Sequence, residues 1–271
     1  MNFSSTQHSL TSKRILISVG FILCLSVLTS ISLVGSEFNQ KWMLSIHTNP
    51  FLPAWVWSLI NICGDAWVVL LILLVSERRR GEVTSWIIKT WLVGAVSVQL
   101  IKNLFPIPRP ANVLGQEMLS LIDHPPLITG SMPSGHAFAA ISCALILCTV
   151  FRQRGVLWSN LCLIAVFSGL VAWARVAVGA HWPSDVIVGA GLAFFVVALT
   201  FVWERYHTWN HWFRSQRGLF LLILIHILIA TYLFYPQSDF FFVYLFQLSL
   251  GCLSMLKAFL LINESIRSRA A

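Results

Sequence analysis

The stretch ARVAVGAHWPSD, residues 174–185, separates two long apolar runs at about 156–178 and 184–203. An apolar run of about 18 or more residues is long enough to cross a membrane as an α-helix. Gly179 and Pro183 interrupt the apolar pattern, and both residue types favour a turn. The stretch therefore predicts a tight polar turn between two membrane-spanning helices. Three ionisable residues lie in this turn: Arg175, His181 and Asp185.

The composition indicates that the rest of the chain is also embedded in a membrane. Of its 271 residues, 57% are hydrophobic and 10% are charged, whereas soluble domains carry about 25% charged residues. Because no linker or internal repeat divides the chain, we expect a single all-α membrane domain, a polytopic helix bundle over residues 1–271. Eight spans are predicted, at about 15–35, 54–76, 84–105, 135–151, 156–178, 184–203, 218–235 and 239–262.

The basic residues gather on one side of the predicted bundle. Of the 18 Lys and Arg residues, twelve fall in segments that share one face if the spans alternate: 13–14, 78–80, 152–154, 205–217 and 267–269. Because loops rich in Lys and Arg stay in the cytoplasm, both termini are predicted to be cytoplasmic, in a multi-pass protein of a bacterial cell (inner) membrane. The net charge of +8 then reflects topology, and no nucleic-acid partner is expected. Lys89 and Lys257 lie near the basic ends of their spans, where long side chains can snorkel.

The opposite, outer face carries three short polar clusters from distant parts of the sequence. They are KNLFPIPRP at 102–110, SMPSGHA at 131–137, and the turn at 174–185. Alternation of the spans brings all three to one membrane surface, whichever side that surface faces. We therefore expect one site built from three parts of the chain.

Each polar cluster has features that favour an anion. Pro106 and Pro108 end the preceding helix and hold Arg109 in an extended segment. In PSGH, the backbone amides lie at a helix N-terminus, where free N–H groups and the helix dipole attract phosphate. Several cations and amides around one point suit a phosphoryl group. The predicted phosphate-binding residues are Lys102, Arg109, Ser134, Gly135 and Arg175.

The histidines in these clusters supply reactive groups. His181 and Asp185 are four residues apart, so they share one face if the helix starts near His181. The carboxylate can then accept from one ring nitrogen and leave the other free as a nucleophile. His136 comes from a different span and can protonate a leaving oxygen. The predicted catalytic residues are His181, His136 and Asp185.

These residues resemble the three motifs of the type 2 phosphatidic acid phosphatase superfamily. The first motif, Lys, six residues, then Arg-Pro, matches Lys102, Arg109 and Pro110. The second, Pro-Ser-Gly-His, matches Pro133, Ser134, Gly135 and His136. The third is Ser-Arg, five residues, His, three residues, Asp, and it matches Arg175, His181 and Asp185, with Ala174 in place of Ser.

The resemblance implies a fold and a reaction. A six-helix membrane core is implied, with the similarity spanning about 54–203, and the two spans within 218–262 exceed that core. His181 is implied to attack phosphorus and form a phosphohistidine that water hydrolyses, with Asp185 orienting it and His136 protonating the leaving group. The family needs no metal, and we expect no cofactor.

The predicted function is that of an integral membrane phosphatase acting on a lipid phosphate or pyrophosphate. Within the family, undecaprenyl pyrophosphate is the favoured substrate, followed by phosphatidylglycerol phosphate and lipid A phosphate. A lipid phosphotransferase with the same phosphohistidine is an alternative, and a transporter is the non-enzymatic one. The partners expected are the bilayer and a phosphorylated lipid, while the sequence leaves the oligomeric state open.

A few polar residues fall outside the predicted site. Asp65 lies near the middle of a span, where an ionisable group is either functional or a hydrogen-bonded structural residue. The loop 111–130 is interpreted as a connector along the membrane surface, with a lid as the alternative. Isolated histidines such as His47 are interpreted as interfacial polar residues.

Overall fold

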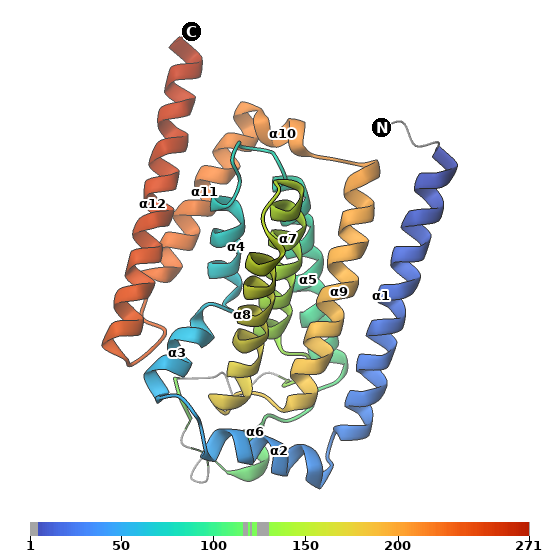
Figure 1. The fold of residues 1–271 in the computed structure, drawn as a ribbon. Helices are drawn as coiled ribbons and strands as arrows, with labels where there is room; N and C mark the ends of the chain where they lie inside the picture. Colours follow the sequence, from blue (N-terminus) through green and yellow to red (C-terminus); the bar gives the residue numbers. More distant parts are fainter. Residues whose placement is uncertain (1–4, 116–118, 120, 124–129, 271) are drawn as a thin grey trace.

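The computed structural model describes residues 5–115, 119, 121–123 and 130–270, and every regular element in these residues is helical. The elements are α1 Ser5–Leu33, α2 Glu37–Thr48, α3 Ala54–Ile62, α4 Ala66–Val75, α5 Thr84–Leu104, α6 Pro110–Leu114, α7 Gly135–Gln153, α8 Trp158–Ala177, α9 Pro183–Tyr206, α10 Asn210–Arg214, α11 Gln216–Leu233 and α12 Phe241–Ala270. The long helices form a bundle, with α2 and α6 at one end and α10 at the other (Figure 1).

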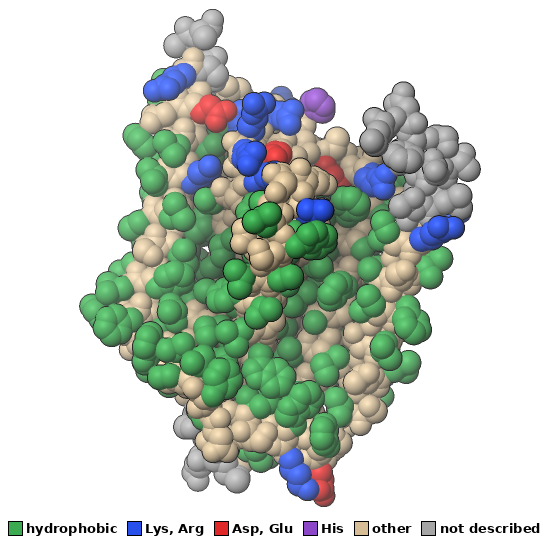
Figure 2. Space-filling view, in the orientation of Figure 1, with side chains coloured by type: hydrophobic (Ala, Val, Ile, Leu, Met, Phe, Trp, Pro, Cys, Tyr) green, Lys and Arg blue, Asp and Glu red, His purple; other side chains and the backbone are tan. Residues whose placement is uncertain are grey.

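The helix lengths match a membrane protein that crosses the bilayer eight times. Seven of the described helices are long and apolar enough to cross a membrane, and the bent pair α3 and α4 makes an eighth if it is counted as one span. Outward-facing apolar side chains such as Ile17 and Val166, 72% and 71% exposed, cover the sides of the bundle (Figure 2). Apolar side chains are compatible with lipid tails, so this surface suits the bilayer. The predicted all-α membrane bundle is confirmed.

The second span is broken rather than straight, because its polar residues offer an alternative to helical hydrogen bonds. The axes of α3 and α4 differ by 59°. Asp65 caps α4 by accepting from the amide of Trp67 at 2.8 Å, and it also accepts from the hydroxyl of Tyr232 on α11 at 2.9 Å. At the break, a Cβ on Gly64 would lie 2.8 Å from Cγ1 of Val171, so glycine permits close packing on α8. These contacts fit the interpretation of Asp65 as a hydrogen-bonded structural residue, and the functional alternative stays a prediction.

The central helix α7 organises the packing. It contacts α4, α5, α8 and α9, while α1 packs along α9 and the α11–α12 pair packs against α3 and α4. One apolar cluster contains Leu71 of α4, Ile146 of α7, Leu222 of α11 and Val243 of α12, all buried. Burying each such side chain contributes about 2 kcal/mol. The two C-terminal spans are therefore packed onto the other helices through a shared core.

The loops richest in Lys and Arg meet at one end of the bundle. Arg154 donates to the carbonyl of Ser76 at 3.0 Å and pairs with Glu82 at 2.9 Å, and Arg214 donates to the carbonyl of Gly81 at 2.9 Å. Both ends of the described chain lie at this end (Figure 1), where Figure 2 shows most of the visible Lys and Arg side chains. The loops that were predicted to share one membrane face therefore lie at one end of the bundle.

Two side chains differ from their sequence-based interpretation. Lys89 was expected to snorkel, but it is fully buried and pairs with Glu204 at 2.7 Å. His47 was expected to be interfacial, but it is 5% exposed and its Nδ1 lies 2.9 Å from the carbonyl oxygen of Ala177. His47 lies on α2, a short helix without an apolar run, so hydropathy did not predict its packing against α8.

Candidate active site

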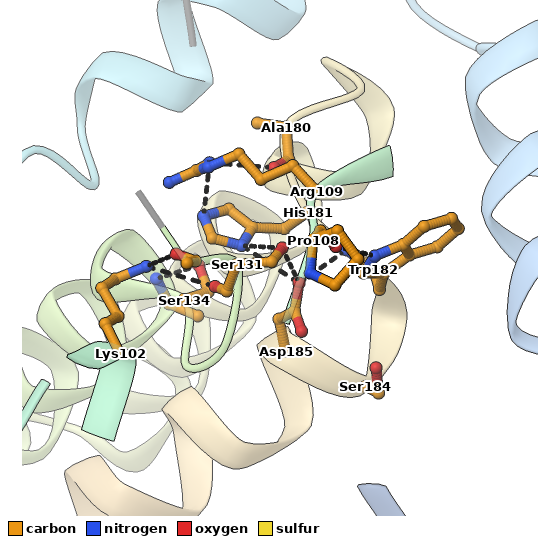
Figure 3. Close-up of polar contacts among 12 residues, drawn as sticks. Lys102, Pro108, Arg109, Ser131, Ser134, Ala180, His181, Trp182, Ser184 and Asp185 are labelled. Carbon is orange, nitrogen blue, oxygen red and sulfur yellow. Dashed lines mark hydrogen bonds and ion pairs between the residues drawn. The ribbon is translucent and has the colours of Figure 1, made fainter. Parts of the chain in front are cut away.

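The three polar clusters converge at the end of the bundle opposite the basic loops. They come from the C-terminal end of α5, the segment before α6, the N-terminus of α7 and the turn between α8 and α9. Figure 3 shows side chains from these segments pointing toward one another. The structure thus brings together parts of the chain that are up to about 80 residues apart, as alternation of the spans predicts.

The centre of the cluster is a buried histidine–aspartate pair. Nδ1 of His181 lies 3.2 Å from Oδ2 of Asp185, and the two residues are 2% and 0% exposed. The same carboxylate oxygen accepts from the hydroxyl of Ser131 at 2.5 Å and from the amide of Trp182 at 2.9 Å. An Nδ1–H donated to this carboxylate leaves a lone pair on Nε2. Ser131 stands just before the second motif and was not predicted as a site residue.

The pairing arises from the way α9 begins. The helix starts at Pro183, so His181 precedes it and does not share a helical face with Asp185 as expected. Asp185 instead occupies the third position of the helix and reaches back to the free amide of Trp182 at 2.9 Å. Acidic side chains are favoured in this first turn because they satisfy unpaired N–H groups. The predicted contact is therefore present, through helix capping.

Gly179 shapes the turn that carries His181. Its φ of +81° lies in the left-handed region that L-residues with a Cβ avoid. A Cβ there would also lie 2.8 Å from Cδ2 of Leu121 and 3.0 Å from Cε1 of His47. Glycine is thus required twice, by backbone conformation and by space.

Arg109 approaches the other ring nitrogen of His181. Its Nη1 lies 3.4 Å from Nε2 of His181 and donates to the carbonyl of Ala180 at 3.0 Å. The residue has extended backbone angles, φ −74° and ψ 159°, as the flanking prolines predict. Trp182 fixes this segment by donating from Nε1 to the carbonyl of Pro108 at 2.8 Å. A phosphoryl group bound at Nε2 would therefore lie beside a guanidinium.

Lys102 extends from the last turn of α5 toward the start of the second motif. Its Nζ donates to the carbonyl oxygens of Gly130 at 2.6 Å and Ser131 at 3.2 Å. These two bonds hold the ammonium beside the residue that also bonds Asp185 (Figure 3). The predicted cation is therefore in place.

Arg175 is buried at the end of α8, 5% exposed. Its Nη1 donates to Oδ1 of Asn61 on α3 at 2.5 Å, and its Nε is buried without a hydrogen-bond partner. Asn61 was not predicted to belong to the site. The stretch NICGD, residues 61–65, is polar within an apolar span, and this was the only sequence feature that marked Asn61. Its contact with Arg175 depends on the position of α3 relative to α8 after folding.

The second motif forms the N-terminus of α7, as predicted. Ser134 caps the helix by accepting from the amide of Ala137 at 3.3 Å, and its own amide donates to the carbonyl of Asp185 at 3.0 Å. Gly135 is the first helical residue. The hydroxyl of Ser134 is thus engaged in the cap, while the helix dipole still favours an anion at this N-terminus.

His136 is half-buried in the first turn of α7. It makes no hydrogen bond within the described part of the chain. Its side chain borders a cavity of about 210 Å³ whose other lining is mostly apolar and comes from α4, α5 and α7. The break at Gly64 is adjacent, since a Cβ there would lie 3.3 Å from Cβ of His136. The ring is therefore placed between the polar cluster and an apolar space.

The surroundings of His181 favour its neutral form. Burial lowers the pKa of this imidazole well below its ordinary 6.5, and the nearby cations Arg175, Arg109 and Lys102 lower it further. Burial also lowers the pKa of Arg109, against the attraction of Asp185. A neutral ring keeps the lone pair that a nucleophile requires.

We expect the pH dependence of activity to reflect this lowered pKa. Because the folded-state pKa of His181 lies below 6.5, its neutral form persists as the pH falls through 6.5 and is lost only well below it. Protonation in the unfolded chain begins near 6.5, so this group's contribution to stability is present above that pH and declines below it. The measurement is kcat/KM against pH, corrected for ionisation of the substrate phosphate. An enzyme limb near pH 6.5 after that correction would contradict a lowered pKa.

The loop 111–130 is described only in part, since residues 116–118, 120 and 124–129 lie outside the described residues. The interpretations of this loop as a connector or as a lid therefore stay predictions. Asp123, which is described, accepts from the hydroxyl of Ser58 at 2.7 Å. Among the described residues, no group of three or more His, Cys, Asp or Glu side chains is arranged to hold a metal ion.

Comparison with known families supports the same segments. The family model described as the PAP2 superfamily matches residues 83–209, a range that contains all eight predicted site residues and ends before α11. Sphingosine-1-phosphate phosphatase 1 of Rattus norvegicus is 26% identical over 205 residues, which cover 74% of this chain and 40% of that protein. Sphingosine-1-phosphate phosphatase 2 of Mus musculus is 28% identical over 156 residues, 56% of this chain and 41% of that protein. The chain thus spans about two fifths of the length of these relatives.

The matches among solved structures include two that cover most of their own chains. The crystal structure of Aquifex aeolicus LpxE covers 63% of this chain and 97% of its own, with a TM-score of 0.49 and 24% identity. The PAP2-type phosphatidylglycerolphosphate phosphatase from Bacillus subtilis covers 70% of this chain and 96% of its own, with a TM-score of 0.39 and 16% identity.

Proposed function

We propose that this chain, whose residues 83–209 match the PAP2 superfamily model, is an integral membrane phosphatase that hydrolyses a lipid phosphate or pyrophosphate through a phosphohistidine on His181. The observation that carries the proposal is the buried pair of His181 and Asp185, 3.2 Å apart, with Arg109 against the opposite ring nitrogen. A nucleophile held by a carboxylate and a guanidinium beside its free nitrogen suit phosphoryl transfer better than transport.

The first chemical step forms the covalent intermediate. Nε2 of His181 attacks phosphorus while the bond from phosphorus to the lipid-side oxygen breaks, and the negative charge spreads over the phosphoryl oxygens. Asp185 holds Nδ1–H and stabilises the positive charge that develops on the ring. His136 donates a proton to the leaving oxygen. Lys102, Arg109 and Arg175 stabilise the transferring group, together with the amides at the start of α7.

The second step regenerates the enzyme. Water attacks phosphorus as His136, now neutral, accepts its proton, and the P–N bond to His181 breaks. Inorganic phosphate is released from a lipid monophosphate, and a lipid pyrophosphate yields phosphate and the lipid monophosphate. Every proton and bond is accounted for by residues of this chain, water and the substrate.

The proposed substrate is a membrane lipid with a terminal phosphate. Undecaprenyl pyrophosphate remains the favoured candidate, with phosphatidylglycerol phosphate and lipid A phosphate as alternatives. The similarity to sphingosine-1-phosphate phosphatases supports adding a long-chain amino-alcohol phosphate to this group. A shared feature, a phosphate on a long apolar chain, agrees with the apolar cavity beside His136.

We place the site on the outer surface of the cell membrane, with both termini in the cytoplasm and the whole chain forming one membrane domain. The basic loops at the opposite end support this orientation, since such loops are retained in the cytoplasm. The charges of the site gather at one end of the bundle and do not line a path through it. This placement argues against the transporter alternative, whereas the phosphotransferase remains compatible with the same phosphohistidine.

Phosphate release by the purified full chain against a panel of lipid phosphates tests the proposal. We expect release from at least one of the four substrate types, and faster hydrolysis than transfer to an added lipid acceptor. Label appearing mainly on the acceptor would favour the phosphotransferase. Failure to release or transfer phosphate from every lipid, by protein that remains folded, would contradict the proposal.

The same assay tests orientation. Sealed right-side-out vesicles should hydrolyse a short-chain lipid phosphate added outside, whereas inverted vesicles should hydrolyse it only after permeabilisation. The reverse pattern would contradict an outer site.

A further inference from the structure

A cavity lined by many charged side chains lies at the basic end of the bundle, away from the site described above. Its volume is about 610 Å³, and its walls come from the α4–α5 loop, α10, α11 and α12. Five cations line it: Arg78, Arg79, Arg80, Arg214 and Lys257. The match to the family model ends at residue 209, so α10, α11 and α12 contribute walls from outside the matched segment.

Two of the cations are fixed by the protein. Arg80 pairs with Glu264 at 2.9 Å, and Arg214 donates to the carbonyl of Gly81. The second acid in the lining, Glu77, is engaged by the α4–α5 loop, since it accepts from the hydroxyl of Thr84 at 2.7 Å. With five Lys and Arg side chains and two Glu side chains, the lining keeps a formal charge of +3 (5 − 2).

The other three cations keep their positive ends available. Arg78, Arg79 and Lys257 form no side-chain hydrogen bond or ion pair within the described part of the chain. Arg78 and Arg79 are exposed, whereas Lys257 is half-buried on α12. Clustered cations without carboxylate partners repel one another, and an anion between them relieves that repulsion. The cavity therefore fits a negatively charged ligand.

Part of the cavity wall is apolar. Leu74 of α4, Leu222 of α11 and Leu260 and Leu261 of α12 line it beside the cations. Leu260 is 52% exposed, so this wall is open to the bilayer side of the helix pair. Basic side chains beside apolar walls between membrane helices suit phospholipid headgroups with their acyl chains. A small soluble anion would use the cations and leave the leucines uncovered.

We propose that this cavity binds an anionic phospholipid, whose phosphate contacts Lys257 and Arg79 and whose acyl chains pack on the leucine side chains of the cavity wall. The lipid belongs to the leaflet at the basic end of the bundle. Its headgroup phosphate is a diester, so the ligand is distinct from the proposed substrate. The site bridges α4, α11 and α12 and joins the C-terminal helix pair to the rest of the bundle.

Binding of dioleoylphosphatidylglycerol to the detergent-solubilised full chain, measured by native mass spectrometry, tests this proposal. The zwitterionic comparison lipid is dioleoylphosphatidylcholine. The cavity variant carries Arg79→Ala and Lys257→Ala. Its matched control carries Arg14→Ala and Lys13→Ala, which remove the same charge from the same end of the bundle on α1. We expect the anionic lipid to bind at least about tenfold more weakly to the cavity variant, with little change in the control.

Two competition arms distinguish the possible sources of the binding. Glycerol 3-phosphate, which has the charge without acyl chains, should not displace the lipid. Vanadate, a phosphoryl analogue, should not displace it from a cavity remote from His181.

Equal weakening of lipid binding in both double variants would overturn the proposal, as would equal binding of the two lipids. Displacement by glycerol 3-phosphate at comparable concentration would assign the cavity to soluble anions, and displacement by vanadate would assign the lipid to the phosphatase site.

Discussion

Replacement of His181 by Gln is expected to lower turnover by about four orders of magnitude or more and to abolish the covalent phosphoenzyme. The amide of Gln can still donate to Asp185, so the buried carboxylate keeps a partner, but it cannot attack phosphorus. Rapid quenching with a phosphate-labelled lipid substrate should trap acid-labile label on His181 in the parent protein. Thermal stability of the variant should remain close to that of the parent.

The matched variant for this experiment is His136→Gln. Its expected loss is about 10²- to 10⁴-fold, the range for a general acid, and it should be largest for a poor alkoxide leaving group. A pyrophosphate substrate has a better leaving group and should lose less. Label that persists in His181→Gln, or an equal loss for both leaving groups in His136→Gln, would show that the two roles are misassigned.

Removal of the buried Arg175 is expected to lower turnover by about 10²- to 10³-fold, the scale of a lost electrostatic donor. In Arg175→Ala the phosphoryl group loses one of three cations, while Lys102 and Arg109 remain. Vanadate, which adopts a five-coordinate geometry like that of the transition state, should inhibit the variant more weakly than the parent. Turnover, thermal stability and vanadate inhibition are to be measured on the same preparation. Activity within a few-fold of the parent would contradict the phosphate site.

Two further variants separate charge from positioning in this prediction. Arg109→Lys keeps the charge but should not restore full activity, because a point charge cannot reproduce the guanidinium fork. Asn61→Ala keeps Arg175 but removes the 2.5 Å bond to its Nη1, so we expect a smaller loss that appears in kcat and in vanadate affinity. An Asn61→Ala loss that appears only as lowered thermal stability would mean that this contact does not position Arg175.

The residues of the site were predictable because their spacing is short and their environment is distinctive. Gly179, His181 and Asp185 lie in one apolar-flanked stretch, and the contact between His181 and Asp185 depends on the local start of α9. Ser131 and Asn61 were not predictable in the same way. Ser and Asn are common at turns and interfaces, so their type alone carries little information. Their contacts depend on where Asp185 and Arg175 lie after folding.

The expected and observed helices differ in the second span, where hydropathy averaged over a window does not register one polar side chain. A window of about 20 residues gives 54–76 one high hydropathy, as the length of a span requires. The helix breaks next to Asp65. This side chain caps α4 and accepts a hydrogen bond from Tyr232, which is 167 residues away in the chain. The hydrophobic pattern within the span carries no information about a hydrogen-bond partner so distant in the chain.

The sequence by itself predicted a bundle of up to eight membrane-spanning helices, with the polar clusters at the end opposite the basic loops. These properties follow from the length of apolar runs and the placement of charge, and a bilayer imposes both on each span separately. Only the tertiary structure decided the bend at Gly64, the bond from Asn61 to Arg175 and the basic cavity bordered by Lys257. The physical reason is that each of these requires side chains from separate helices to pack at ångström range, which depends on the relative rotation and tilt of the helices and not on the hydropathy of either one.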